Sequence, residues 1–209
     1  MTRVEFIKVL EEGGFSYRID SDNVVVTHSS FVYLGSPKSL PPGVEFKNKG
    51  SVDLKSLKSL PSGMVFKNEG GVYLGLLKSL PPDVDFKNEG GVYLKSLKSL
   101  PSGMVFKNEG PIDLSSLKSL SSGVQFDNEG SVYLSSLESL PPDVKFENRG
   151  DVDLSSLTSL PPGVEFNNGG SVWLGSLVGG QFNHWKGNIQ GVDSKRLLNL
   201  MIKKGLFER

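Results

Sequence analysis

The sequence predicts a mainly β fold, a single-domain β-solenoid of about eight coils of 20 residues each, and three observations support this prediction. First, one motif recurs every 20 residues without an insertion or deletion, with the consensus L-P-x-G-V-x-F-x-N-x-G-x-V-x-L-x-S-L-x-S. Second, apolar and polar side chains alternate inside each unit, and a period of two is typical of strands. Third, a unit of 20 residues has no room for a helix of about ten residues or more beside two strands.

Residues 1–20 are expected to form an N-terminal cap that closes one end of the stack of coils. Thr2 and Glu5 have the spacing of a capping box, so a helix is expected to begin here and to end at Gly13-Gly14. The apolar face of this helix is expected to consist of Val4, Ile7 and Leu10. Residues 15–19 and 24–27 are then expected to be two strands joined by a polar turn.

Residues 21–180 are expected to form the solenoid itself, and we number each unit so that residues 41, 61 and 81 are position one. Val44 and Phe46 alternate with polar neighbours and so predict one strand, and residues 52–54 predict a second. Gly50 between them predicts a corner with positive φ. Residues 57–61 have a period of three and predict a 3₁₀-like or extended side wall, after which Pro61-x-Gly63 predicts another corner.

An asparagine recurs at position eight of the repeat, on the inward side of the first strand. We interpret this row as structural, because stacked amides can bond each other and the backbone of the corner. Its members are Asn48, Asn68, Asn88, Asn108, Asn128, Asn148 and Asn168.

Residues 181–209 are expected to form a C-terminal helical cap. Asp193 can begin a helix that runs through Lys204 and ends at Gly205. His184 and Trp185 lie in the least repetitive stretch of the chain, and we expect them to help dock this cap.

The repeat resembles leucine-rich-repeat solenoids, in particular the short bacterial type with Leu-Pro in every unit. The residues that carry the resemblance are the L-x-x-L-P-x-x-V-x-F-x-N segments, and they cover residues 34–177. Members of such families are recognition scaffolds, and any enzymatic activity lies in another domain. The spacing V-x-F-x-N and the second strand leave both an open horseshoe and a straighter, closed β-helix as possible cross-sections.

Position thirteen carries the candidate binding residues, because the alternation of the second strand directs this position to solvent. Tyr and Trp dominate binding hot spots, although aromatic side chains also favour strands for structural reasons alone. The residues are Tyr33, Asp53, Tyr73, Tyr93, Asp113, Tyr133, Asp153 and Trp173. A row of lysines at position eighteen, which includes Lys58, Lys78 and Lys98, is expected to contribute.

Composition limits the other chemistry that this chain can perform. It has 209 residues, no Cys and no net formal charge, so it has no disulfide framework, thiolate metal site or cysteine nucleophile. His28 and His184 are too few for a histidine-rich metal cluster. The acidic position-thirteen residues lie several coils apart, which is too far for a pair of glycosidase carboxylates. We therefore expect no catalytic residue, no cofactor, no bound metal and no small-molecule substrate.

Another protein is the partner that these features favour. The segment from Leu54 to Gly70 is identical to that from Leu94 to Gly110, which indicates recent duplication and is typical of fast-changing binders. The preferred hypothesis is a bacterial or phage protein that inhibits a host protein such as a defence effector. Alternatives are a carbohydrate-binding solenoid and one that binds nucleic acid or a ribonucleoprotein.

The same hypothesis sets the expected location of the protein. No apolar stretch approaches the roughly 18 to 20 residues that span a bilayer. Acidic side chains near the start also argue against a cleaved signal peptide. We therefore expect a cytoplasmic protein, of a bacterium or an infected host cell, without a membrane contact.

Overall fold

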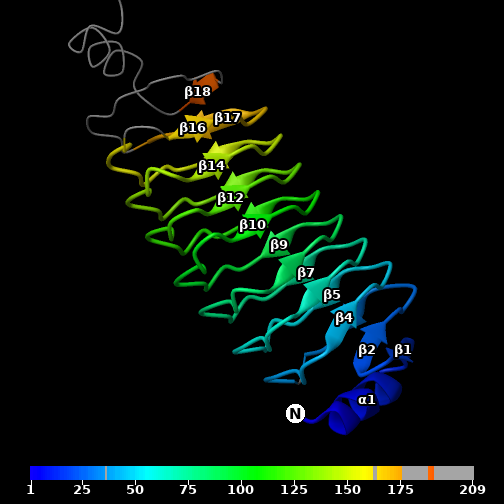
Figure 1. Cartoon of the computed structure of the whole chain (residues 1–209). Helices are drawn as coiled ribbons and strands as arrows, with labels where there is room; N and C mark the ends of the chain where they lie inside the picture. Colours follow the sequence, from blue (N-terminus) through cyan, green and yellow to red (C-terminus); the bar gives the residue numbers. More distant parts are fainter. Residues whose placement is uncertain (36, 162–163, 176–187, 191–209) are drawn as a thin grey trace, which may run out of the picture.

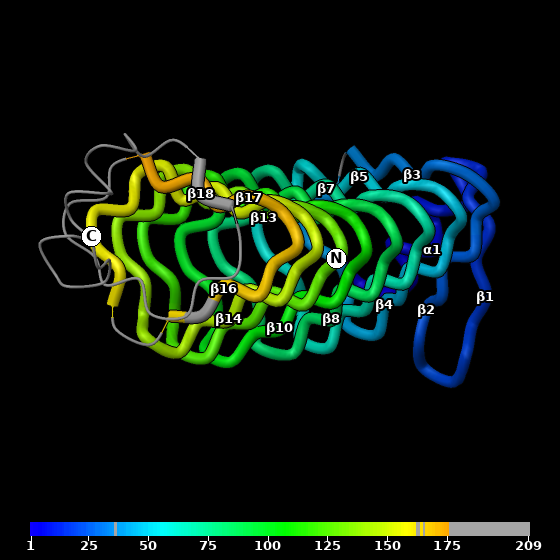
Figure 2. The backbone as a smooth tube through the Cα atoms, turned by 90° about the horizontal axis from the view of Figure 1, so that it is seen from above, coloured from blue at the N-terminus to red at the C-terminus, as the bar shows by residue number. Residues whose placement is uncertain are grey.

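The computed structural model describes residues 1–35, 37–161, 164–175 and 188–190. These residues form a mainly β, parallel solenoid of about seven turns, which confirms the predicted fold class (Figure 1). The sequence predicts about eight units because it includes a degenerate first unit and a last unit that runs into residues outside the described ranges. Figure 2 shows the coils stacked along one axis as flattened loops, with strands on two opposite sides.

Each coil contributes one strand to each side, and the strands pair in parallel with a register of 20 residues. One side, which we call the split face, contains β2 (Asn23–Val26), β4 (Val44–Phe46), β6 (Val65–Phe66), β8 (Asp85–Phe86), β10 (Val105–Phe106), β12 (Gln125–Phe126), β14 (Lys145–Phe146) and β16 (Glu165–Phe166). The other side, the continuous sheet, contains β3 (Val32–Tyr33), β5 (Val52–Asp53), β7 (Val72–Tyr73), β9 (Val92–Tyr93), β11 (Ile112–Asp113), β13 (Val132–Tyr133), β15 (Val152–Asp153), β17 (Ser171–Trp173) and β18 (Asn188–Gln190).

The core lies between the two sides and is built from repeated apolar columns. The seven phenylalanines at position six, from Phe46 to Phe166, stack on one another with ring centroids 5.1 to 6.0 Å apart. The widest separation, 6.0 Å, lies between Phe86 and Phe106. At the same place the split face divides into two sheets, because β8 and β10 do not pair.

The turns of the coil agree with the sequence at one corner and differ at the other. The N–H of Leu57 donates to the carbonyl of Leu54 at 3.0 Å, so a 3₁₀-type turn spans residues 54–57 and ends where the predicted side wall begins. Gly63 has a φ of +72°, as its corner predicts. The prediction of a positive φ at Gly50 is wrong. Glycine is required there because a Cβ would lie 2.5 Å from the backbone of Ser30 and Phe31 in the preceding coil.

The asparagine row bonds the corner backbone, and the prediction that its amides also bond each other is wrong. Asn68 Nδ2 donates to the carbonyls of Gly70 at 2.6 Å and Gly50 at 3.2 Å, and the other coils repeat this pattern. The Oδ1 atoms of all seven asparagines are buried without a hydrogen-bond partner in the described part of the chain. Each NH₂ group donates instead to two backbone carbonyls of the corner, so its hydrogens are not directed at the Oδ1 of the neighbouring amide.

The N-terminal helix α1 (Arg3–Glu12) begins as predicted, with both hydrogen bonds of the capping box between Thr2 and Glu5, and it ends at Gly13. The predicted apolar face is wrong in part. Phe6 and Leu10 are buried against the core, whereas Val4 is 77% exposed. Because residues four apart lie on one helix face, the Phe6–Leu10 pair and not Val4 faces the first coil.

The helix is followed by the predicted pair of strands. Strand β1 (Tyr17–Asp20) pairs with β2 in antiparallel fashion. At the other end, β18 extends the continuous sheet by pairing with β17. The predicted helix over 193–204 and the docking residues His184 and Trp185 lie outside the described residues. Among the residues that the structure describes, no helix has the length and apolar character needed to cross a bilayer.

Candidate binding surface

The position-thirteen residues lie beside one another along the outer side of the continuous sheet, since the strand register pairs each with the next. Tyr33, Tyr133 and Trp173 are the most exposed, at 60%, 43% and 38%. Four others are half-buried: Tyr73, Tyr93, Asp113 and Asp153. The structure therefore brings the predicted row together, with aromatic and acidic members in the order that the sequence gives.

Asp53 is the exception to the predicted exposure, because only 5% of its surface is accessible. Its carboxylate accepts the backbone N–H of Lys55 at 3.0 Å and pairs with the Lys55 ammonium at 2.9 Å. The hydrogen bond to Asp53 and the negative charge of this carboxylate raise the pKa of Lys55. Alternation along a strand determines on which side a residue lies, but the neighbouring side chains determine whether water reaches it.

Tyr73 and Tyr93 form a stacked pair at the middle of this surface. Their ring centroids are 4.7 Å apart and their planes differ by 4°. The Lys55 ammonium lies 5.1 Å from the centre of the Tyr73 ring and comes from the preceding coil, on the side away from Tyr93. Both faces of the Tyr73 ring are therefore in contact with neighbours. Burial is the main cause that raises the pKa of Tyr93, and the charges of nearby groups raise it further.

The residue at position eleven decides how each ring lies. Tyr73 and Tyr93 lie across glycine backbone, since a Cβ added to Gly91 would be 2.9 Å from the Tyr93 hydroxyl oxygen. Phe31 occupies position eleven in the first coil, where it stacks on Tyr33 at 6.4 Å. The Tyr33 ring lies over Gly35 instead, because a Cβ added to Gly35 would be 2.4 Å from the Tyr33 hydroxyl oxygen. Glycine at position eleven is thus the sequence signal for a half-buried ring, which period-two reasoning did not use.

A hollow of about 370 Å³ lies beside the stacked pair, and its walls are Lys55, Tyr73, Gly75, Tyr93 and Lys95. We call it the tyrosine–lysine hollow. It exists because position fifteen is lysine in the coils before and after but glycine at Gly75. A Cβ on Gly75 would meet only the Lys55 Cγ, at 3.8 Å. Gly75, Lys55 and Lys95 were not among the predicted binding residues, and the signal for them is a glycine between two lysines at position fifteen.

The predicted lysines of position eighteen form a row on the side wall next to this surface. Lys58, Lys78 and Lys98 are all exposed. The coils that carry them are hydrogen-bonded, since the N–H of Lys98 donates to the carbonyl of Lys78 at 2.9 Å. Further along the same row, Lys118 pairs with Glu138 at 2.7 Å. The row therefore begins basic and becomes neutral toward the C-terminal coils.

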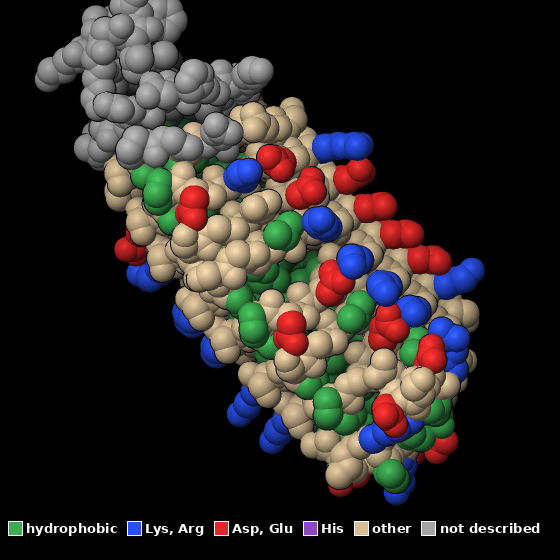
Figure 3. All heavy atoms as spheres, in the orientation of Figure 1, with side chains coloured by type: hydrophobic (Ala, Val, Ile, Leu, Met, Phe, Trp, Pro, Cys, Tyr) green, Lys and Arg blue, Asp and Glu red, His purple; other side chains and the backbone are tan. Residues whose placement is uncertain are grey.

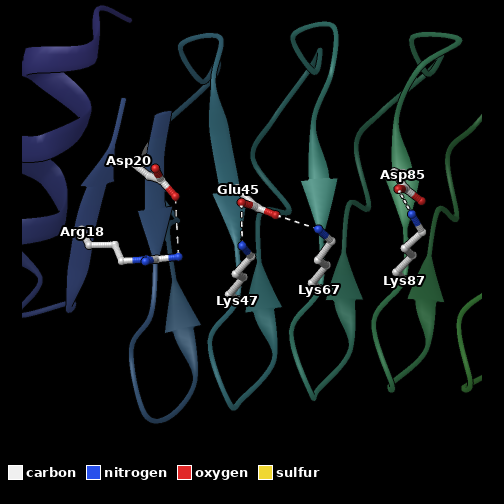
Figure 4. Close-up of polar contacts among 7 residues, drawn as sticks. All are labelled: Arg18, Asp20, Glu45, Lys47, Lys67, Asp85 and Lys87. Atoms are coloured by element: carbon white, nitrogen blue, oxygen red, sulfur yellow. Dashed lines mark hydrogen bonds and ion pairs between the residues drawn. The ribbon is translucent and has the colours of Figure 1, made fainter. Parts of the chain in front are cut away.

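Three lysines of the split face, Lys47, Lys67 and Lys87, are paired with acidic neighbours. Rows of basic and acidic side chains run side by side along the molecule (Figure 3). Figure 4 shows Glu45 between Lys47 and Lys67, with both ammonium groups 3.1 Å from its carboxylate, and Lys87 paired with Asp85 at 2.7 Å. Lys55 and Lys95 of the continuous sheet are paired in the same way, with Asp53 and Asp113, so the freer positive charge lies on the side wall at Lys58, Lys78 and Lys98.

The acidic members of the row stand apart from one another. Strands β7 and β9 separate Asp53 from Asp113, and β13 separates Asp113 from Asp153. Among the described residues, no three His, Asp or Glu side chains gather as ligands for one metal ion. Comparison with protein-family models, with curated proteins and with solved structures found no match to the chain.

Proposed function

We propose that the protein is a non-enzymatic binding scaffold of leucine-rich-repeat type, which captures another protein on the outer side of its continuous sheet. The observation that carries this proposal is the aligned row of aromatic side chains, two of which, Tyr73 and Tyr93, line the tyrosine–lysine hollow. Rings held on a hydrogen-bonded sheet lose little entropy on binding, and Tyr and Trp dominate binding hot spots.

The orientation of the rings favours a protein over a carbohydrate or a nucleic acid. Sugars and bases bind aromatic side chains by stacking on an open ring face. Tyr73 has Tyr93 on one face and the Lys55 ammonium on the other, so neither face of this ring is open for stacking. Edges, hydroxyls and ammonium groups suit the mixed apolar and polar surface of a protein.

The biological setting of the proposal comes from the duplicated segment. Residues Leu54–Gly70 and Leu94–Gly110 are identical, although packing alone does not require identical residues, because a core tolerates a change such as Met to Val. Such recent copying suits a bacterial or phage protein that competes with a changing host. The proposal is therefore a cytoplasmic inhibitor of a host protein, for example a defence effector.

The test is affinity purification from the native host, followed by mass spectrometry, with the protein and a variant in which Tyr73, Tyr93 and Tyr133 are changed to Ser. We expect the variant to lose the captured partner while its thermal unfolding stays nearly unchanged. A matched control changes Lys47, Lys67 and Lys107 of the split face to Ser and should retain the partner. Undiminished capture by the tyrosine variant contradicts the proposal.

A further inference from the structure

We propose that the tyrosine–lysine hollow receives one large apolar side chain from an acidic segment of the partner protein. This inference rests on the proposed function, and it specifies the chemistry of the partner at the centre of the binding surface. The surface on which it rests has an apolar centre, basic residues around that centre, and acidic residues further along the same face.

The centre of the surface is apolar. The walls of the hollow are tyrosine rings, glycine backbone and the aliphatic stems of two lysines. Leu76 follows Gly75 directly and is 49% exposed, whereas the same position is serine in the neighbouring coils, at Ser56 and Ser96. An apolar side chain placed in this hollow would remove the tyrosine rings and the lysine stems from water, which is the main source of binding energy at a hot spot.

The surround of the hollow is basic. Lys55 and Lys95 flank it, and Lys58, Lys78 and Lys98 lie on the adjoining side wall. The carboxylates nearest to these lysines, Asp53 and Asp113, are already paired with Lys55 at 2.9 Å and Lys95 at 3.5 Å. The lysines of the side wall therefore attract acidic groups on either side of the apolar anchor.

The basic character ends in the coils that follow. Glu138 occupies the position of the lysine row and neutralises Lys118 at 2.7 Å. The carboxylates of Asp151 and Asp153 lie on or beside the continuous sheet. These carboxylates repel an acidic partner, so its acidic segment is confined to the coils around the hollow. A nucleic acid would need a longer basic track and open ring faces, and at the hollow both faces of the Tyr73 ring are covered.

The probe for this proposal is a library of short random peptides displayed on phage and selected on the purified protein. We expect enriched peptides to combine Asp or Glu with one large apolar residue. Enrichment of basic or neutral peptides, or no enrichment at all, overturns the proposal. Oligothymidylate and phosphatidylserine vesicles serve as further probes, and tighter binding of either one than of the enriched peptides also overturns it.

The Gly75→Lys variant distinguishes the contribution of the hollow to binding from the contribution of positive charge. It fills the hollow with the residue that both neighbouring coils carry at this position, and the space above Gly75 accepts a side chain. Charge alone would make this variant bind the acidic peptides more tightly, whereas occupancy of the hollow by the peptide requires a loss of about tenfold or more in affinity. Ser135→Lys adds the same charge elsewhere in position fifteen and should bind like the unchanged protein.

The outcomes distinguish this inference from the proposed function. If the tyrosine variant loses the native partner but Gly75→Lys keeps it, the binding face stands and the hollow is not the anchor site. If neither variant loses the partner, both proposals fail. Loss of the native partner and of the selected peptides by Gly75→Lys, with retention by Ser135→Lys, supports both.

Discussion

Glycine has different physical tasks at different positions of this repeat. A Cβ on Gly90 would lie 2.4 Å from the backbone of Gly70 and Gly71 in the preceding coil, so the absence of a side chain permits close stacking. Gly103 has open space around it but a φ of +71°, which disfavours other residues. Gly75 has neither constraint, and its lack of a side chain leaves the hollow open.

These differences predict unequal costs for the same substitution. Gly90→Ala should lower the free energy of unfolding by about 1–3 kcal/mol or more, because the added methyl group meets the backbone of the preceding coil, which cannot move aside. Gly75→Ala should change it by less than about 0.5 kcal/mol. Urea unfolding followed by circular dichroism measures both values. Equal costs would show that the coils do not approach each other closely at position ten.

Glu45 links the charge on the split face to the pH dependence of stability. Its partial burial raises the pKa, but hydrogen bonds from Lys47 and Lys67 and their positive charges outweigh this effect. The net result is a pKa lowered from its ordinary value of 4.5. The folded state therefore holds the proton less tightly than the unfolded state does.

A lowered carboxyl pKa stabilises the fold above the unfolded value and loses this contribution as the pH falls through the folded value. We expect Glu45→Gln to lose stability near neutral pH, by roughly 1 kcal/mol or less at this partly exposed pair, and to show a smaller further loss in acid. Thermal unfolding at neutral pH and below pH 4.5 measures the difference. Glu109→Gln, an exposed rim position, controls for net charge, and parallel curves for the two variants would contradict the role of Glu45.

At the scale of the element, the repeated strands could be predicted from the sequence because each apolar position serves the same core. Period two located both strands of every coil and the inward columns, and Thr2 and Glu5 located the start of the helix. The burial of Asp53 and the hollow at Gly75 could not be predicted in this way. Both depend on side chains from adjacent coils, which alternation within one strand does not describe.

The interruption of the split face between β8 and β10 also depends on neighbouring coils. Val65–Phe66 and Val105–Phe106 belong to identical segments, yet β6 pairs with both neighbouring strands while β10 pairs only with β12. Identical residues therefore pair differently, and the difference lies in the coils on either side. The local sequence could not have located this interruption.

Hydrogen exchange should detect the interruption directly. The N–H groups of Lys67 and Lys87 donate to Phe46 at 2.7 Å and Phe66 at 2.8 Å in the preceding coils. The equivalent amide of Lys107 faces the gap between β8 and β10. We expect Lys107 to exchange about five to ten times faster, as loss of one hydrogen bond implies. Equal protection of the three amides, measured by NMR, would mean that the two sheets are joined in solution.

At the scale of the whole molecule, the solenoid is a one-dimensional stack in which each coil contacts its neighbours. Removal of residues 71–110 takes out two complete units and joins Gly70 to Pro111, the same junction that Gly110 makes with Pro111. We expect the shortened chain to fold with an unchanged β spectrum and to unfold at a lower temperature. Removal of residues 71–80, half a unit, takes every later apolar column out of register and should prevent cooperative unfolding. Equal behaviour of the two deletions would contradict a stack whose coils pair in a register of 20 residues.

The two tyrosines and the glycine of the hollow fall in residues 71–93, between the identical segments, and its two lysines, Lys55 and Lys95, are equivalent residues of those segments. Recombination between the genetic copies of those segments would excise or double this cassette in a single step, without a new junction sequence. A lineage that carries the duplication could therefore change its valency toward a partner by unequal crossing-over, and two hollows on one rigid rod would raise avidity without improving either contact.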